Sequence, residues 1–459
     1  MERKNVWLSY GEPQLRELEE VCGRYKNCLD RGKTERECVR LAVEMAEKAG
    51  YRNLQEMIEK GERLKPQDKV YLSYMDKSIV LYQLGNRPLE QGLNILGAHI
   101  DSPRVDAKQV PLYEDTEFAY LDGHYYGGIK KYQWVALPLA LHGVVVKKDG
   151  TRVEIVIGEK EEDPVFAFTD LLIHLSSKQL EKTGAKVVEG EQLDLLFGSR
   201  PLKDTEKEAV QANILRLLKE TYDIEEADFL SAELEIVPAG KARDCGLDRS
   251  MIMGYGHDDR VCAFTSLMAM LDMGEVDKTA CCILVDKEEI GSVGATGMAS
   301  RFFENSLAEL LELREGYSDL KLRRAMAHSR MLSSDVSAAY DPLYGDVFEK
   351  KNAAYFANGI VFNKYTGSRG KSGSNDANAE YMAALREIMD RNGVAYQTAE
   401  LGKIDAGGGG TIAYILANYG MEVIDSGVPV LSMHAPWEVV SKADVYEALK
   451  CYRSFLKEA

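Results

Sequence analysis

Short apolar runs alternate with longer, helix-prone stretches along much of this sequence, and this alternation is the feature that most constrains its fold. The clearest case is the run TACCILV (279–285), which lies between the helix-prone segments 260–273 and 298–315. Short apolar runs predict buried strands, and apolar residues spaced three and four apart predict helices. Strands that alternate with helices form a sheet that helices cover on both faces. We therefore expect an α/β fold.

The length of the chain indicates more than one domain. It has 459 residues, which is too long for one ordinary hydrophobic core. The middle part, 105–245, is rich in strand-like runs around one charged, helix-prone stretch near 201–226. Residues 12–62 are predicted to form helices ahead of the main sheet. We therefore predict one main domain, formed by 1–104 and 246–459, with an inserted β-rich domain at 105–245.

Composition and charge narrow the possible partners and location. The net charge of −17 repels nucleic acid and anionic membranes, so we expect neither as a partner. No stretch approaches the roughly 18 to 20 apolar residues of a membrane span, and the first residues lack the apolar core of a secretory signal. The cysteines are scattered and form no C-x-x-C pair. We therefore expect reduced thiols and a cytoplasmic location.

Side chains that can bind metals end several of the apolar runs or begin the helix that follows. They are His99 and Asp101 after NILGA, Asp258 and Asp259 after GYGH, Glu288 and Glu289 after ILVDK, Asp335 after MLSS, and His434 after VLSM. In open α/β sheets the carboxyl ends of the strands line one crevice, so we expect these side chains to converge. Zinc accepts such nitrogen and oxygen donors, and a shared carboxylate bridges two metals. The pattern therefore predicts a two-metal site.

The chemistry of these side chains suggests a role for each ligand. His99 and His434 are the candidate nitrogen ligands, and Asp258, Glu289 and Asp335 are the candidate oxygen ligands. The simpler alternatives are hydrogen-bonded core histidines and, for Asp258, a cap on the helix that follows. These separate explanations would all have to be true at once for the metal site to be absent. One shared site explains all five residues more simply, so we favour it.

Two further acids have predicted roles beside the ligands. Asp101 lies two residues after His99, where a carboxylate can accept from the second ring N–H and fix the tautomer. Glu288 would be the general base on a water molecule while Glu289 faces the metals. A nearby dication would offset the repulsion between the adjacent glutamates. The alternative is that Glu288 and Glu289 are hydrated acids of an ordinary loop.

The segments that carry these residues resemble the M18 family of zinc aminopeptidases, also called the aspartyl aminopeptidase family. The matching segments are GAHIDSPR (97–104), DDR (258–260), DKEEIGSVGATG (286–297), SSDVSAAYDP (333–342) and SMHAPWE (432–438). They occur in the family's order and span nearly the whole chain. The resemblance implies a dizinc exopeptidase fold with a central mixed sheet flanked by helices, plus an inserted β-rich domain for assembly.

The resemblance also implies which residues hold each ion. His99, Asp258 and Asp335 would hold one zinc ion, and His434, Asp258 and Glu289 would hold the other, with Asp258 as the bridge. Two Zn²⁺ ions per subunit are thus expected, with Co²⁺ or Mn²⁺ as possible substitutes.

The resemblance further implies the catalytic residues and the assembly. Glu288 would be the base and Asp101 the orienting acid. The family forms a tetrahedral homododecamer in which a histidine from a neighbour's inserted domain enters the site. The segment TDLLIHL (169–175) fits that motif, so His174 is the candidate. The alternative for His174 is a buried histidine in a helix.

One loop departs from the better-known eukaryotic members of the family. The segment FNKYTGSRGKSGSNDANAE (362–380) replaces a shorter loop that lines the substrate pocket, and Gly373 stands about where that loop has a tyrosine. Lys364, Arg369 and Lys371 are cations that would meet an acidic side chain or would simply be solvated. The preference for acidic N-terminal residues is therefore open.

A second loop matches the family near the site. The segment GGGGT (407–411) has glycines that let backbone N–H groups approach a ligand.

Three functions compete on this sequence. The leading one is a metal-dependent aminopeptidase that acts on peptides with a free N-terminus. The second is a related dizinc deacylase or carboxypeptidase, which would act on blocked substrates or on C-termini. The third is a shell-forming scaffold without activity, which would need neither the ligands nor Glu288. The presence of the full ligand set favours an enzyme.

Overall fold

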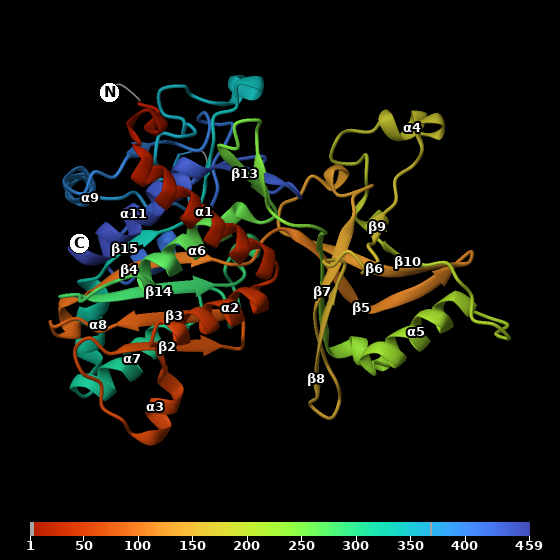
Figure 1. The fold of residues 1–459 in the computed structure, drawn as a ribbon, viewed down its shortest axis with the longest axis horizontal. Helices are drawn as coiled ribbons and strands as arrows, with labels where there is room; N and C mark the ends of the chain where they lie inside the picture. The colour runs from red at the N-terminus through yellow and green to blue at the C-terminus, as the bar shows by residue number, and fades with distance from the viewer. Residues whose placement is uncertain (1–3, 368–369) are drawn as a thin grey trace. The chain divides into compact units, whose positions relative to one another are not determined.

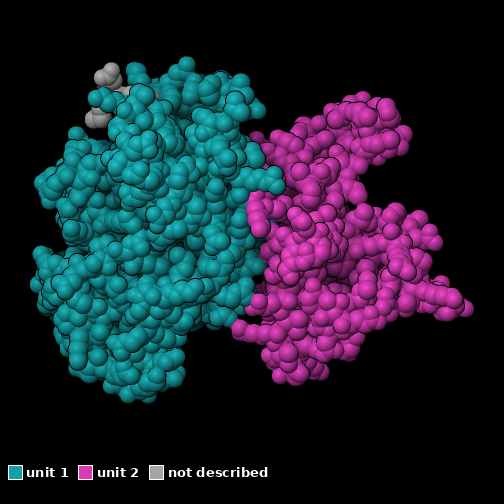
Figure 2. All heavy atoms as spheres, in the orientation of Figure 1, with its two compact units in different colours: residues 1–101, 242–433, 438–459 teal, residues 102–241, 434–437 magenta. Residues whose placement is uncertain are grey.

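The computed structural model describes residues 4–367 and 370–459. Contacts divide the chain into two compact units, which Figure 2 colours separately. Unit 1 contains residues 1–101, 242–433 and 438–459, and unit 2 contains residues 102–241 and 434–437. The predicted insert, 105–245, overlaps unit 2, and its status as an assembly domain stays a prediction.

A nine-stranded sheet forms the centre of unit 1, in the order β1-β2-β3-β14-β4-β15-β19-β17-β18. The strands are β1 (Arg52–Asn53), β2 (Lys69–Tyr74), β3 (Ser78–Gln83), β4 (Leu93–His99), β14 (Thr279–Val285), β15 (Arg330–Ser333), β17 (Ile360–Asn363), β18 (Tyr396–Thr398) and β19 (Glu422–Gly427). The four central strands, β14, β4, β15 and β19, are parallel, whereas β3 and β17 run antiparallel to their neighbours β14 and β19. The sheet is therefore mixed, and its four central strands end on the same side.

Helices cover both faces of this sheet (Figure 1). One face packs against α1 (Glu12–Arg31), α2 (Glu35–Lys48), α6 (His257–Leu271), α9 (Ala379–Arg391) and α11 (Lys442–Glu458). The other packs against α3 (Leu54–Lys60), α7 (Phe302–Glu315), α8 (Asp319–Ala327) and α10 (Ala413–Ala417). In β14, Cys282 and Leu284 face the first core, and Cys281 and Ile283 face the second. A strand buried on both faces reads as a continuous apolar run, which explains TACCILV.

The segment RMLSSDVSAAY (330–340) contributes to two sheets of unit 1. β15 ends at Ser333, and β16 (Ser337–Ala338) belongs to a second sheet. That sheet has five strands in the order β12-β13-β21-β20-β16. Its remaining strands are β12 (Arg243–Cys245), β13 (Met251–Gly254), β20 (Pro429–Leu431) and β21 (Glu438–Ser441). The chain therefore changes sheets at Asp335.

Unit 2 is built on a seven-stranded sheet in the order β8-β7-β11-β5-β6-β10-β9. The strands are β5 (Arg104–Asp115), β6 (Phe118–Tyr126), β7 (Leu139–Val146), β8 (Arg152–Ile157), β9 (Ala167–Phe168), β10 (Leu195–Gly198) and β11 (Ala232–Pro238). Neighbouring strands pair antiparallel, and helix α5 (Ala209–Tyr222) contacts β5, β6 and β10. A short helix, α4 (Ser177–Leu180), follows β9.

The predicted mixed α/β fold is confirmed, and the helices expected within 12–62 are α1, α2 and α3. Within residues 4–367 and 370–459, no helix has both the length and the apolar character needed to cross a membrane.

Candidate metal centre

Three adjacent strand ends bring the candidate residues of unit 1 together. In the sheet, Val285 of β14 pairs with His99 of β4, and Ser333 of β15 pairs with Gly97 of β4. The chain therefore leaves β14 toward Glu288, and β15 toward Asp335, next to the end of β4. The expected convergence at the carboxyl ends of parallel strands follows directly from this register.

Two groups of ligand-type atoms meet at this edge of the sheet. One atom each from His99, Asp258 and Asp335 lie within 4.8 Å of one another, and so do atoms of His99, Glu288 and Glu289. The Nε2 atom of His99 is 3.2 Å from a carboxylate oxygen of Asp258 and 3.8 Å from one of Glu288. His99 thus stands at the centre of the cluster, with its Nε2 toward the carboxylates.

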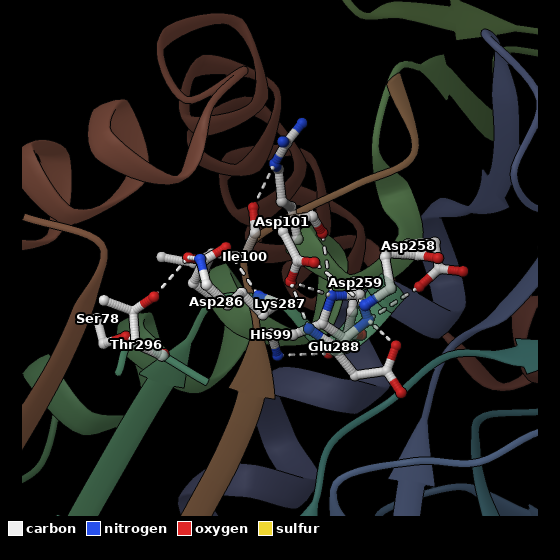
Figure 3. A network of polar contacts seen from close by, with 12 residues as sticks. Ser78, His99, Ile100, Asp101, Asp258, Asp259, Asp286, Lys287, Glu288 and Thr296 are labelled. Atoms are coloured by element: carbon white, nitrogen blue, oxygen red, sulfur yellow. Dashed lines mark hydrogen bonds and ion pairs between the residues drawn. The ribbon is translucent and has the colours of Figure 1, made fainter. Parts of the chain in front are cut away.

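Asp101 connects two of the strand ends (Figure 3). The Nδ1 atom of His99 is 3.0 Å from the carbonyl oxygen of Asp101 and 3.3 Å from its carboxylate. The same carboxylate accepts hydrogen bonds from the backbone N–H groups of Glu288 at 3.2 Å and Glu289 at 3.1 Å. The sequence suggested the contact with His99. It did not indicate the two hydrogen bonds from backbone N–H groups, because every residue except proline has such a group and the sequence pattern therefore does not reveal which of them bind a side chain.

Asp258 is placed at the start of α6 by a partner that sequence reasoning missed. The backbone N–H of Asp258 donates to the carboxylate of Glu438 at 3.0 Å, and Glu438 is buried. The φ/ψ angles of Asp258 and Asp259 are not helical, and the preceding Gly256 has φ 74°. Glu438 closes the segment SMHAPWE, so its position in that motif was the available signal. Asp259 is fully buried, and its carboxylate accepts from the backbone N–H of His99 at 3.4 Å.

His257, the remaining histidine of this segment, is accounted for by its own hydrogen bonds. Its Nδ1 is 2.6 Å from the Tyr25 hydroxyl and its Nε2 is 3.2 Å from the Ile252 carbonyl. Burial lowers the pKa of His257 to about 3. The ring is therefore neutral, with Nε2–H donating to the carbonyl and Nδ1 accepting from Tyr25.

The electrostatics of the cluster suit a cation. Burial, together with the charges of Asp259 and Glu288, raises the pKa of Asp335 well above its usual range. Burial alone would lower the pKa of His99, but hydrogen bonds with Asp101 and Asp258 outweigh it and raise that pKa. Carboxylates crowded around one imidazole are stabilised by a dication. Nitrogen and oxygen donors in this number fit zinc.

The two other predicted histidines belong to unit 2. His434 has φ 65°, and its Nδ1 lies 2.8 Å from the Gly128 carbonyl. Its role as a metal ligand stays a prediction. His174 is exposed in a single 3-10 turn, Ile173–Leu175, so the alternative of a buried histidine in a helix is wrong. Its role in a neighbour's site stays a prediction as well.

Two described lysines of the loop 362–380 pair with the same acid, Asp376. Lys371 contacts the Asp376 carboxylate at 2.9 Å and lies 3.8 Å from the centre of the Tyr365 ring, and Lys364 also pairs with Asp376. Gly373 has φ 70°. Arg369, the third predicted cation, lies outside the described residues.

The glycine-rich loop 407–411 lies against this segment. The Gly409 N–H donates to the Thr366 carbonyl at 3.1 Å, and a Cβ on Gly407 would lie 2.3 Å from the Leu401 carbonyl oxygen. A cavity of about 240 Å³ is lined by residues of both loops, including Tyr365, Lys371 and Gly407.

Known proteins resemble this chain over most of its length. The family model for aminopeptidase I zinc metalloproteases (M18) matches residues 28–456. The chain belongs to the M18 family. It is therefore a zinc aminopeptidase, as the resemblance of its segments predicted. The chain is 61% identical to a probable M18 family aminopeptidase 1 of Clostridium acetobutylicum, covering 99% of this chain and 98% of that protein.

Several solved structures share the fold over at least 95% of this chain. The crystal structure of aminopeptidase I from Clostridium acetobutylicum has a TM-score of 0.93 at 59% identity, with 100% of this chain and 99% of that chain covered. An M18 aminopeptidase from Thermotoga maritima has a TM-score of 0.95 at 43% identity, with both chains fully covered (100%). The mApe1 dodecamer of S. cerevisiae has a TM-score of 0.76 at 21% identity, over 95% of this chain and 96% of that chain. This last likeness is one of fold.

Proposed function

We propose that this M18 zinc aminopeptidase uses two metal ions and that Glu288 is its general base. The observation that carries the proposal is that ligand-type atoms of His99, Asp258 and Asp335 lie within 4.8 Å of one another, as do those of His99, Glu288 and Glu289. Nitrogen and oxygen donors this close together suit a co-catalytic metal pair.

The ligands divide into two sets that share one carboxylate. His99, Asp258 and Asp335 would hold one ion, and His434, Asp258 and Glu289 would hold the other. Support for the bridge comes from Asp258, which lies 3.2 Å from His99 and within 4.8 Å of Glu289. When bound, zinc polarises a peptide carbonyl and makes water more acidic, and Co²⁺ or Mn²⁺ would supply similar chemistry.

Glu288 then performs the proton transfers. Its side chain is 15% exposed and 3.8 Å from Nε2 of His99, so it borders the ligands and still reaches solvent. It takes a proton from the attacking water and gives it to the leaving amine. Asp101 fixes the tautomer and orientation of His99, because Nδ1 faces the carbonyl and carboxylate of Asp101.

The substrates are peptides with a free N-terminus. A dizinc deacylase would instead prefer blocked substrates, and a scaffold would cleave neither. A panel of aminoacyl chromophores, with the matching N-acetylated series, separates the three functions. The acidic members of the panel test whether Lys364 and Lys371, which pair with Asp376, can turn to an acidic side chain.

Self-association is part of the proposed function. Apolar side chains around His174 are strongly exposed: Leu172 54%, Ile173 68% and Leu175 68%. Exposed apolar patches mark interaction surfaces. We infer that this turn packs against another copy in a tetrahedral homododecamer and delivers His174 to that copy's metal centre. All eight cysteines are free, which suits a cytoplasmic location.

The experiment that tests the base is Glu288→Gln, compared with Glu289→Gln at the adjacent position. Glu288→Gln should keep its metals and lose about 10²- to 10⁴-fold in kcat, the usual contribution of a general base. Glu289→Gln should lose a metal equivalent, because it removes a ligand. Elemental analysis and kcat are measured on the same samples. A metal-loaded Glu288→Gln protein with near-normal kcat would refute the assignment.

A further inference from the structure

The strand end before the two glutamates carries a charged pair that the proposed mechanism does not use. Asp286 follows β14 and is 1% exposed. Its carboxylate accepts from the backbone N–H of Lys287 at 2.7 Å, from the Lys287 ammonium at 2.8 Å and from the Thr296 hydroxyl at 2.7 Å. Asp286 therefore binds both ends of the residue that follows it (Figure 3).

Lys287 has a backbone conformation that lysine seldom adopts. Its φ and ψ are 69° and 12°, in the left-handed region, where a side chain other than hydrogen is disfavoured. The Lys287 carbonyl accepts from the N–H of Ile290 at 3.3 Å and from that of Ser292 at 2.7 Å. The chain thus turns sharply at Lys287, and such conformations persist only where surrounding contacts hold them.

The Lys287 side chain packs against Gly294. A Cβ at Gly294 would lie 3.1 Å from both Cδ and Cε of Lys287, so residue 294 leaves room for the lysine stem. Thr296, which donates to Asp286, also accepts from the Asp286 N–H at 3.2 Å and from the Ser78 hydroxyl at 2.5 Å. The pair is therefore anchored to β3 through Ser78.

The turn sets the position of the two glutamates. Three successive backbone N–H groups bind two carboxylates: that of Lys287 binds Asp286, and those of Glu288 and Glu289 bind Asp101. The backbone of the loop is thereby fixed from β14 on one side and from β4 on the other. A small rotation at Lys287 would move the Glu288 carboxylate, and misplacement of a reacting group by about 1 Å can cost on the order of 10²-fold in rate.

We propose that Asp286 and Lys287 form a clamp that positions Glu288 for proton transfer. The clamp rests on the proposed role of Glu288 as the base. Neither residue needs to touch substrate, so both are positioning residues. The Lys287 ammonium donates to one carboxylate oxygen of Asp286, and the backbone N–H of Lys287 donates to the other.

The test compares four substitutions in the full-length, metal-loaded enzyme. Lys287→Met keeps the stem and removes the ammonium; it should lower kcat about tenfold, with KM within about twofold and metal content unchanged. Lys287→Arg should retain most of kcat, because it restores a cation. Lys287→Gly relieves the left-handed conformation but removes the clamp, so it should lose kcat as Lys287→Met does. Lys60→Met is the matched control, since it removes an exposed lysine that pairs with Glu56 at 3.0 Å; its kcat should be unchanged.

A double-variant comparison separates the clamp from the base. In the Glu288→Gln background, Lys287→Met should lower kcat no further, because the group that it positions is gone. Normal kcat in Lys287→Met beside an inactive Glu288→Gln would overturn the clamp alone. Near-normal kcat in Glu288→Gln would overturn the proposed base and the clamp together. Loss of activity in Lys287→Met through metal loss or KM would also overturn the clamp, because the pair would then be structural.

Discussion

The carboxylate of Asp101 accepts a hydrogen bond from the backbone N–H of Glu288, at 3.2 Å. An acid at the end of β4 therefore holds the loop that follows β14, next to the His99 ring that it also contacts. Because its second oxygen accepts from the Glu289 N–H at 3.1 Å, the carboxylate is occupied on both sides.

Asp101→Asn should impair both turnover and metal binding. An asparagine amide has only one oxygen, so its NH₂ group would face the backbone N–H of Glu288 or of Glu289. That N–H would then have lost its acceptor. Loss of a partner behind a metal ligand typically costs about 10- to 100-fold in metal affinity or activity. Metal titration and kcat at saturating metal measure the two effects. Wild-type values in both would show that Asp101 has no orienting role.

Asp258→Asn should weaken both ions at once, because one carboxylate is proposed to bridge them. The expected result is loss of two metal equivalents on dialysis against a chelator under conditions where the wild type keeps both. Asp259→Asn is the neighbouring control; the Asp259 carboxylate accepts from the backbone N–H of His99 at 3.4 Å. Loss of a single equivalent in Asp258→Asn would place the bridge elsewhere.

Mixing two inactive proteins should restore activity if His174 acts across a subunit boundary. His174→Phe lacks the donated histidine and Glu288→Gln lacks the base, so some mixed neighbours would join an intact metal centre to an intact His174. His124→Phe, at another exposed histidine of unit 2, should be active without mixing. Confirmed subunit exchange with no return of activity would exclude a shared site, and a fully active His174→Phe would make His174 merely structural.

Stability should rise with pH between about 8 and 10.5 through Lys278. Burial, aided by Arg330 and Arg87, lowers the pKa of Lys278 from 10.5 to about 8. In this window the unfolded chain holds the proton that the folded chain has lost, so the free energy of unfolding increases with pH. Lys278→Met should therefore show a smaller gain in Tm from pH 8 to pH 10 than the wild type. Lys48→Met, at a lysine on α2 that is 72% exposed, is the control, and equal gains in all three proteins would contradict the prediction.

The strand ends of the candidate metal centre were predictable because a strand buried on both faces has a continuous apolar sequence. TACCILV is apolar throughout because β14 is covered on both faces. The end of this apolar run indicated Glu288 and Glu289 as candidate site residues. His99 was found in the same way at the end of β4. The change of sheets after Ser333 was not predictable, because four residues of β15 and two of β16 are too short to show a period.

Contacts made by backbone groups were also beyond the sequence. Nothing in the pattern showed that the Asp258 N–H would donate to Glu438, or that Lys287 would turn left-handed. Positive φ is predicted from glycine, and here lysine adopts it because Asp286 binds its N–H and its ammonium. The conformations of Asp258 and Lys287 depend on contacts in the folded structure. The partner of Asp258 lies far away in the sequence, and both contacts involve main-chain N–H groups.

Gly427 shows how closely the backbone is packed behind a proposed ligand. A Cβ at this position would lie 1.8 Å from the carbonyl oxygen of Asp335, where the chain passes from one sheet to the other. Even alanine would have to push Asp335 aside, although residue 427 carries no functional group. A saturation scan of β19 should therefore find position 427 intolerant of every replacement. A method that ranks residues by the chemistry of their side chains would overlook Gly427. Among related sequences, we expect this position to vary as little as a catalytic residue does.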